Sequence, residues 1–352
     1  MRLLLAPAGG RDFACSRVRI FQHLPALAER GVRWTIVPPA GGVERNGPIA
    51  RARVRSGQLA QALRLARLAP AYDVTLVQRL LLPVPLQRLL SRRARALVFD
   101  FDDAIYTTPG GGVEGSRWLA PRAVRWAHML AVSQAATVAT AHLADRARRH
   151  QRHAFVITSP VDTERYHPTE PARGPGVVVG WIGSPATSRY LEPLLPVFRR
   201  LAARHRTLRI ELVGADLRLA GAGVRVREWR WDTELSALQA FDVGVMPLPD
   251  DEWARAKAGY KLLQYMACGA ASMASPVGVG RALVRPGETG WLAADEAAWE
   301  EALTALIRDP EGRRKMGRAG RELVEAEYSL RLWTPRLRGV LETVATRSER
   351  DR

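Results

Sequence analysis

The fold is decided at residues 241–278, where the chain reads FDVGVMPLPDDEWARAKAGYKLLQYMACGAASMASPVG. The apolar run at 241–246 predicts a buried strand, which is followed by a polar loop and by a helix that opens near Gly259. A second short strand then ends in the glycine loop at 275–278. A helix amino terminus offers unpaired N–H groups and the positive end of the helix dipole, so this order of elements is typical of phosphate-binding α/β sites.

Two lysines stand out in this stretch, because the chain has 50 arginines and only 3 lysines. Lys257 and Lys261 are four residues apart and would share one helix face if both were helical. Lysine carries a compact point charge that suits a phosphate group. We therefore predict that both lysines contact a phosphate.

The length and composition of the chain indicate a folded protein of two domains, because 352 residues exceed what one hydrophobic core usually supports. Cys15 and Cys268 form no disulfide or metal pattern. We find no signal peptide and no apolar run of about 18 residues that could span a membrane. We therefore expect a cytoplasmic protein, either free or peripheral on the inner face of the cell membrane.

Positive charge is concentrated in the first half of the chain. Residues 1–168 hold 25 Arg against 11 Asp and Glu, whereas residues 169–352 hold 28 Lys and Arg against 24 acids. Ten arginines fall in residues 51–95 alone, where the helix-like segments 56–68 and 83–95 also carry regularly spaced leucines. Such helices either lie on an anionic bilayer or pack their leucines on the sheet with the arginines in water. The expected partner is an anionic membrane surface and not a nucleic acid.

The first domain begins with a β-loop-α-β unit at residues 2–38, which predicts a parallel sheet. Its first loop would lie at the carboxyl edge of the sheet, where open α/β sheets bind ligands. The arginines of this loop would face a cleft or simply cover the following helix. The candidate acceptor or cleft residues here are Gly9, Gly10, Arg11 and Arg17.

An acidic cluster follows the apolar strand predicted at 96–101. Asp102 and Asp103 would lie at the mouth of a cleft, where carboxylates bind hydroxyl groups or orient a nucleophile. An aspartyl phosphatase is disfavoured, because no acidic metal-binding pair follows the lysines. A metal-binding Asp-x-Asp is less typical of the first domain of a two-domain chain. We name Asp102 and Asp103 as the catalytic candidates, and we expect a short strand at 129–133 after them.

The alternation of strands and helices restarts after a polar segment rich in proline and glycine, which predicts two doubly wound α/β domains in tandem. Three helices close the chain, and the last could return to the first domain. The predicted divisions are an N-terminal Rossmann-like domain at 1–165, a linker at 166–176, a second Rossmann-like domain at 177–328 and a C-terminal helix at 329–352.

Several spaced blocks of the second half stand out. They are GWIGS at 180–184, DVGVMP at 242–247, KLLQYMACG at 261–269, ASPVG at 274–278, GETGWL at 287–292 and the helix at 313–320. With these blocks in this order, the chain resembles the family-4-type retaining glycosyltransferases with the GT-B fold (glycosyl transferases group 1) over nearly its whole length.

The resemblance implies two Rossmann-like domains facing a central cleft, with a nucleotide-diphosphate sugar on the second domain and a glycan, lipid-linked or other hydroxyl acceptor on the first. It implies retaining hexosyl transfer for cell envelope polysaccharide synthesis, without a metal or another cofactor, because cations and a helix terminus would neutralise the leaving diphosphate. The donor-binding candidates are Arg189, Lys257 and Lys261 for the diphosphate, Gln264 for the ribose, and Gly183, Ser184, Ser275, Val277 and Gly278 for nearby contacts.

The chain departs from the family at several of these positions. Family members carry two glutamates eight positions apart, which correspond here to Ala256 and Gln264. An arginine and a lysine of the family's loop correspond to Ser184 and Arg189. The alternative hypothesis is therefore a non-catalytic GT-B-like protein that binds anionic lipid or polysaccharide through its basic N-terminal domain.

Overall fold

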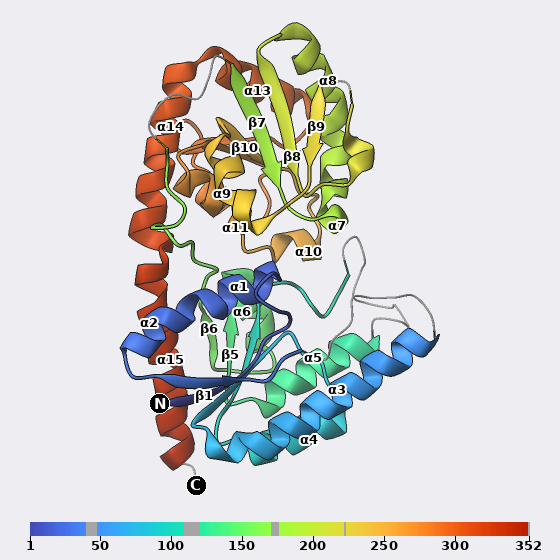
Figure 1. The fold of residues 1–352 in the computed structure, drawn as a ribbon, viewed down its shortest axis with the longest axis vertical. Helices are drawn as coiled ribbons and strands as arrows, with labels where there is room; N and C mark the ends of the chain where they lie inside the picture. Colours follow the sequence, from blue (N-terminus) through green and yellow to red (C-terminus); the bar gives the residue numbers. More distant parts are fainter. Residues whose placement is uncertain (40–47, 109–119, 170–175, 222, 351–352) are drawn as a thin grey trace. The chain divides into compact units, whose positions relative to one another are not determined.

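The computed structural model describes residues 1–39, 48–108, 120–169, 176–221 and 223–350 (Figure 1). The chain forms two compact units. The first unit contains Met1–Ser159, Ala256–Ala258 and Leu330–Arg352, and the second contains Pro160–Arg255 and Gly259–Ser329.

The division between the units differs in detail from the domain limits predicted from the sequence. Residues 160–165 were assigned to the first domain, but they lie in the second unit. Their backbone explains this, because the Val161 N–H donates to the Tyr328 carbonyl at 3.0 Å and Val161 forms a β-bridge with Ser329. Part of the predicted linker, residues 170–175, lies outside the described residues.

The first unit is built on a six-stranded parallel sheet with the order β2-β1-β3-β4-β5-β6. The order reverses between β1 and β3, so the loops that follow these strands flank the point where open α/β sheets bind ligands. The strands are β1 (Arg2–Ala6), β2 (Arg33–Ile36), β3 (Val74–Gln78), β4 (Leu97–Phe101), β5 (Ala135–Val138) and β6 (Ala154–Val156).

Helices cover both faces of this sheet. Figure 1 shows α3, α4 and α5 together on one face, and α1, α2 and α15 on the other. The helices are α1 (Ala14–Arg19), η1 (Phe21–His23), α2 (Leu24–Glu29), α3 (Pro48–Leu68), η2 (Ala69–Ala71), α4 (Val84–Arg93), α5 (Ala120–Val132), α6 (Ala141–Arg148) and α15 (Leu330–Arg350).

The strand predicted at 129–133 is wrong. Met129 and Leu130 are fully buried, but they belong to α5, and the strand of this region is β5. The short apolar run at 129–132, MLAV, fits a buried helix end as well as a strand, and such runs cannot be assigned by periodicity alone.

The last helix, α15, packs on the first unit. Leu337, Leu341 and Val344 recur at helical spacing and are buried in the same core as Leu3 and Leu24. Each such side chain contributes about 1.5–3 kcal/mol when it leaves water. Among the described residues, no helix is both long and apolar enough to cross a bilayer.

The second unit has its own six-stranded parallel sheet, with the order β12-β11-β10-β7-β8-β9. This is the Rossmann order, and it reverses between β7 and β10, so the loops after these two strands flank the expected ligand position. The strands are β7 (Val177–Ile182), β8 (Leu208–Val213), β9 (Val224–Arg227), β10 (Val243–Met246), β11 (Ala271–Ala274) and β12 (Gly290–Leu292).

The helix α11 lies unusually close to this sheet. Gly244 of β10 faces the ring of Tyr265, and a Cβ added there would come within 2.2 Å of the ring. The Tyr265 hydroxyl also accepts from the Ile182 N–H at 3.1 Å, which fixes α11 beside the end of β7. The helices of this unit are α7 (Pro185–Ser188), η3 (Arg189–Leu194), α8 (Leu195–Arg204), η4 (Leu217–Leu219), α9 (Trp231–Gln239), α10 (Glu252–Arg255), α11 (Tyr260–Ala267), α12 (Gly280–Leu283), α13 (Glu296–Arg308), α14 (Pro310–Leu323) and the π-helical turn η5 (Val324–Tyr328).

Candidate functional site

A buried carboxylate anchors the carboxyl edge of the first sheet. The Asp100 side chain is 3% exposed and pairs with Arg19, whose Nε lies 3.3 Å from Oδ2. The Thr137 hydroxyl donates to Asp100 at 2.7 Å, and the Gln78 amide donates at 3.3 Å. Asp100 is therefore surrounded by donors and holds β3, β4, β5 and α1 together.

The two catalytic candidates both contact cations. Arg79 Nε lies 3.3 Å from Asp102 Oδ1, and the same guanidinium pairs with Asp103. The ammonium of Lys257, in the segment Ala256–Ala258 of this unit, donates to Asp103 Oδ1 at 2.8 Å. Burial opposes ionisation of Asp103, but Lys257 and Arg79 outweigh it and lower the pKa of this carboxyl to about 2. Asp103 is therefore an anion held between two cations.

Sequence reasoning missed Arg79 and the role of Cys15. Arg79 follows β3 directly and has a φ of 55°, which makes it the only residue other than glycine with a positive φ in the described ranges. The Cys15 thiol donates to Asp102 Oδ1 at 3.1 Å. Burial, followed by the charge of Asp102, raises the pKa of this thiol well above its ordinary value. The position of Arg79 directly after a predicted strand could have identified it as a site residue. No pattern in the sequence around Cys15 indicated that its thiol would contact Asp102.

The glycine loop after β1 lies at the same edge. The Gly9 N–H donates to the Ser16 hydroxyl at 2.9 Å, and a Cβ at Gly9 would come within 2.4 Å of Phe13. Gly10 accepts from the Phe13 N–H at 3.1 Å. Arg11 is exposed with its guanidinium 5.1 Å from the centre of the Phe21 ring, and Arg17 is a half-buried residue of α1.

In the second unit, Lys261 lies beside the end of β7. Its ammonium is 4.0 Å from the centre of the Trp181 ring, and a Cβ on Gly183 would come within 2.6 Å of it. The helix α11 begins at Tyr260, after Gly259 with a φ of 69°. Lys257 precedes this helix, so the two lysines are not both helical and do not share a helix face. Lys261 alone stands in its first turn.

The loop after β7 contributes two further donor candidates. Ser184 is exposed at the start of α7, and its N–H donates to the Thr187 hydroxyl at 3.3 Å. Arg189 is exposed, with its guanidinium 5.1 Å from the centre of the Tyr190 ring. Both residues therefore follow the strand end that Lys261 contacts.

Gln264 is buried at 4% exposure and donates from Nε2 to Glu234 Oε1 at 3.3 Å. Glu234 is 2% exposed and also accepts from the Trp229 indole at 2.5 Å and from the Tyr166 hydroxyl. Glu234 was missed in the sequence, because an acid in the first turn of a helix is usual at the surface.

The glycine loop after β11 is tightly built. The Ser275 hydroxyl accepts from the Leu248 N–H at 3.0 Å, which ties this loop to the one after β10. Val277 is 6% exposed. Gly278 has a φ of 52°, and a Cβ there would come within 2.6 Å of the Arg255 carbonyl oxygen, so only glycine fits.

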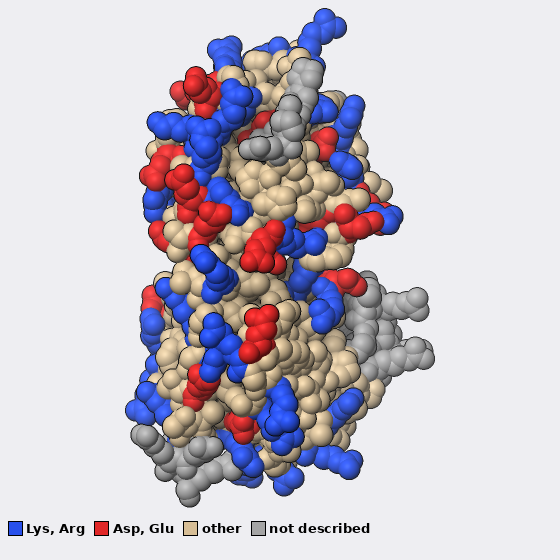
Figure 2. All heavy atoms as spheres, turned by 60° about the vertical axis from the view of Figure 1, so that its left-hand side comes forward, with Lys and Arg blue, Asp and Glu red and all other residues tan. Residues whose placement is uncertain are grey.

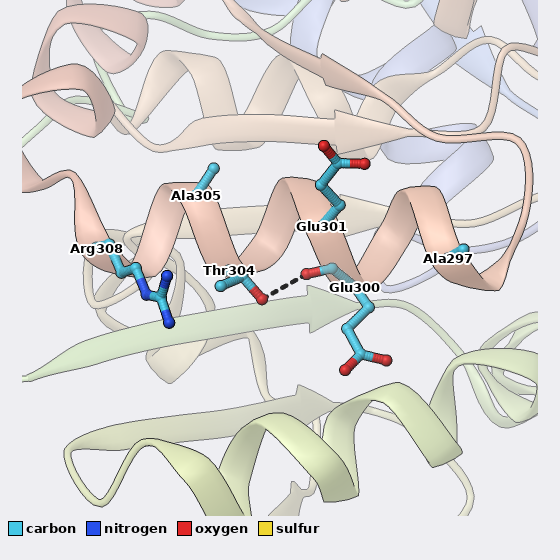
Figure 3. A pocket seen from close by; sticks show the side chains of 6 residues that line it. All are labelled: Ala297, Glu300, Glu301, Thr304, Ala305 and Arg308. Atoms are coloured by element: carbon cyan, nitrogen blue, oxygen red, sulfur yellow. Dashed lines mark hydrogen bonds between the residues drawn. The ribbon is translucent and has the colours of Figure 1, made fainter.

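The pocket in Figure 3 contains none of these candidates. It lies on the outer face of α13 and is lined by Ala297, Glu300, Glu301, Thr304, Ala305 and Arg308. Glu300 already pairs with Arg200 and Arg204, each at 2.6 Å. Within the described ranges, no three His, Cys, Asp or Glu side chains could together hold a metal ion.

Comparison with known proteins finds a family model that matches part of the second unit. Residues 176–309 match the family model described as Glycosyl transferases group 1, so the resemblance seen in the sequence is confirmed for this segment. A search of curated proteins finds no match.

Solved structures show the fold of the whole chain. Sucrose-phosphate synthase from Thermosynechococcus elongatus matches with a TM-score of 0.77 and 17% identity, over 98% of this chain and 99% of that one. Alr3699/HepE of Anabaena, in complex with UDP and glucose, matches with a TM-score of 0.69 and 16% identity, over 97% and 99%. The outer core galactosyltransferase WaaB matches with a TM-score of 0.63 and 10% identity, over 97% and 99%. The predicted α/β fold of the GT-B type, with two Rossmann-like domains, is confirmed.

Proposed function

We propose that this chain, whose residues 176–309 match the model of the group 1 glycosyltransferases, transfers a sugar from a nucleotide-diphosphate donor to a hydroxyl acceptor. The observation that carries the proposal is Lys261, which stands in the first turn of α11 beside Gly183, at the strand-order reversal of the second sheet. A fixed ammonium, a helix amino terminus and a loop without side-chain bulk together suit a diphosphate.

The donor diphosphate would lie against Lys261, the loop of Gly183 and Ser184, and the glycine loop at 275–278. Arg189 is exposed after the same loop and could reach the terminal phosphate oxygens. Lys257 is already paired with Asp103, so we assign it to the carboxylates of the first unit and not to the diphosphate. Cationic side chains would offset the leaving group without a metal ion.

We further propose retaining transfer of the family-4 type, with a hexose as the transferred sugar. The complexes of HepE with UDP and glucose support a uridine donor of this kind. Asp102 and Asp103 would bind acceptor hydroxyls, since carboxylates held by Arg79 and Lys257 remain good hydrogen-bond acceptors. The acceptor would be a glycan or a lipid-linked sugar of the cell envelope.

The function is tested by a thermal-shift screen with nucleoside diphosphates, followed by a transfer assay with the nucleotide sugar that binds. A ligand that binds only the folded state adds about 2.7 kcal/mol to the free energy of unfolding when its concentration is about a hundred times Kd. The melting temperature rises as a result. We expect UDP or GDP to give a shift and its sugar to be consumed. No shift with any nucleoside diphosphate would contradict the proposal, and lipid binding without turnover would favour the non-catalytic alternative.

We also propose an anionic membrane surface as a partner, and the charge of the first unit supports this proposal. The helices α3, α4 and α5 contain five, three and two arginines and no acidic residue. Leu59 and Leu63 of α3 are 46% and 49% exposed, one turn apart on the outward face that also carries Arg64 and Arg67. On the face seen in Figure 2, by contrast, acidic and basic side chains are interspersed. Exposed leucines among unopposed arginines suit the interface of an anionic bilayer.

Reversing charge on α3 is expected to weaken vesicle binding strongly. Each arginine near an anionic surface contributes about 1 kcal/mol, so Arg64→Glu/Arg67→Glu should weaken binding by at least about 30-fold. Flotation with vesicles of phosphatidylcholine and phosphatidylglycerol, at low and high salt, measures this.

The matched control is Arg314→Glu/Arg318→Glu, which makes the same charge change at exposed positions of α14. Leu59→Ala/Leu63→Ala should weaken binding even at unchanged charge. Equal binding to vesicles of phosphatidylcholine alone, or equal loss in the control, would contradict membrane docking.

A further inference from the structure

The inference concerns the buried pair of Glu234 in α9 and Gln264 in α11. A carboxylate only accepts hydrogen bonds, so the Gln264 amide must turn its NH₂ group toward Glu234, as the 3.3 Å contact shows. The amide oxygen, Oε1, is thereby left on the other side of the group. The orientation of this amide follows from its neighbour, although its two ends have nearly the same shape.

Glu234 also fixes a second side chain of the same region. The half-buried Trp229 donates its indole N–H to Oε2 at 2.5 Å, and the Tyr166 hydroxyl donates to Oε1. Trp229 lies close to Gly214, because a Cβ added to this glycine would come within 3.0 Å of the Trp229 Cβ. The same added Cβ would come within 2.3 Å of the Gly183 carbonyl oxygen. One carboxylate therefore joins the start of α9, the middle of α11 and the segment after β9, and this segment lies beside Gly214 of the loop after β8.

We infer that Glu234 is a positioning residue that holds the Gln264 amide with Oε1 ready to accept a ribose hydroxyl of the donor, and that holds Trp229 beside it. This inference rests on the proposed function and concerns the nucleoside half of the same site. It also explains why glutamine stands at position 264. A glutamate there would place two carboxylates about 3.3 Å apart in a buried position, where both cannot remain charged without strong repulsion.

Exchanging the carboxylate of Glu234 and the amide of Gln264 tests whether the two side chains act together in donor binding. Binding of UDP, or of the nucleoside diphosphate that the screen selects, is measured for Glu234→Gln, for Gln264→Glu and for the double exchange. Each single variant should weaken binding by about 10-fold or more, since contacting residues couple by 0.5–3 kcal/mol. The double exchange restores a carboxylate beside an amide, with the roles reversed, and should recover affinity to within about 5-fold of the parent.

Two further measurements separate positioning from general stability. The KM for the nucleotide sugar should rise in the single variants while kcat changes less than about 3-fold, because the pair lies away from the reacting bond. Glu211→Gln is the matched control, since Glu211 is another buried glutamate of this unit, 8% exposed and paired with Arg227 at 3.4 Å. This control should lower the melting temperature without changing donor affinity.

The outcomes distinguish this inference from the proposed function. A double exchange that binds no better than the single variants, or a Gln264→Glu variant that binds like the parent, would overturn the inference alone. A parent protein that binds no nucleoside diphosphate would overturn the proposed function and the inference together. If the single variants fail to fold, Trp229→Phe removes one donor to Glu234 and should still raise the KM of the donor.

Discussion

Lys261→Ala is expected to lower kcat/KM for the nucleotide sugar by about 10²- to 10³-fold, the size of effect seen when one fixed electrostatic contact to a developing charge is removed. The ammonium stands beside the bare Gly183 and 4.0 Å from the centre of the Trp181 ring, so no flexible loop has to bring it into place. The charge that develops on the leaving diphosphate would meet it in the first turn of α11. Steady-state transfer kinetics with the preferred donor measure the loss.

Two variants define what the lysine supplies. Lys261→Arg keeps the charge but replaces the compact ammonium with a larger, planar guanidinium. The ammonium already lies close to Gly183, since a Cβ added to this glycine would come within 2.6 Å of it. We therefore expect partial activity at best. Lys315→Ala is the matched control, because Lys315 is the third lysine of the chain and is exposed on α14. Full activity in Lys261→Ala, at an unchanged melting temperature, would remove the proposed diphosphate site.

The sequence predicted the two sheets because each buried strand is an apolar run bounded by glycine, proline or polar residues. It also predicted that the loops after strands such as β1 and β7 lie at the carboxyl edge of a parallel sheet, since these strands begin each alternation. The predicted strand at 129–133 failed where a buried helix end and a buried strand have the same composition.

The partners of individual side chains could not be predicted, because they depend on contacts between residues far apart in the chain. Lys257 and Asp103 are separated by 154 positions, and Glu234 and Gln264 by 30. The spacing of Lys257 and Lys261 suggested a common helix, but the left-handed backbone of Gly259 starts the helix between them. The sequence therefore indicated the strand-end loops that hold the candidate residues, while the contacts of these residues required the structure.

Asp103→Asn is expected to destabilise the first unit by about 2 kcal/mol at pH 7, because it removes the anion between Arg79 and Lys257 and leaves two cations facing each other. The loss stays below that of a fully buried pair, since these side chains are 16% to 21% exposed. The two units need not unfold together, so the measurement is hydrogen exchange of the β4 amides, which reports the first unit alone.

The pH dependence identifies the carboxylate as the cause. The pKa of Asp103 is lowered from 3.8 to about 2 in the folded protein, so its stabilising charge is fully present above about pH 4 and is lost as the pH falls toward 2. The difference between the parent and Asp103→Asn should therefore shrink between pH 5 and about pH 2.5. Asp102→Asn is the matched control and should cost less, because Asp102 pairs with Arg79 and accepts from the Cys15 thiol, whereas Asp103 pairs with both Arg79 and Lys257. A difference that stayed constant with pH would show that shape, and not charge, makes Asp103 stabilising.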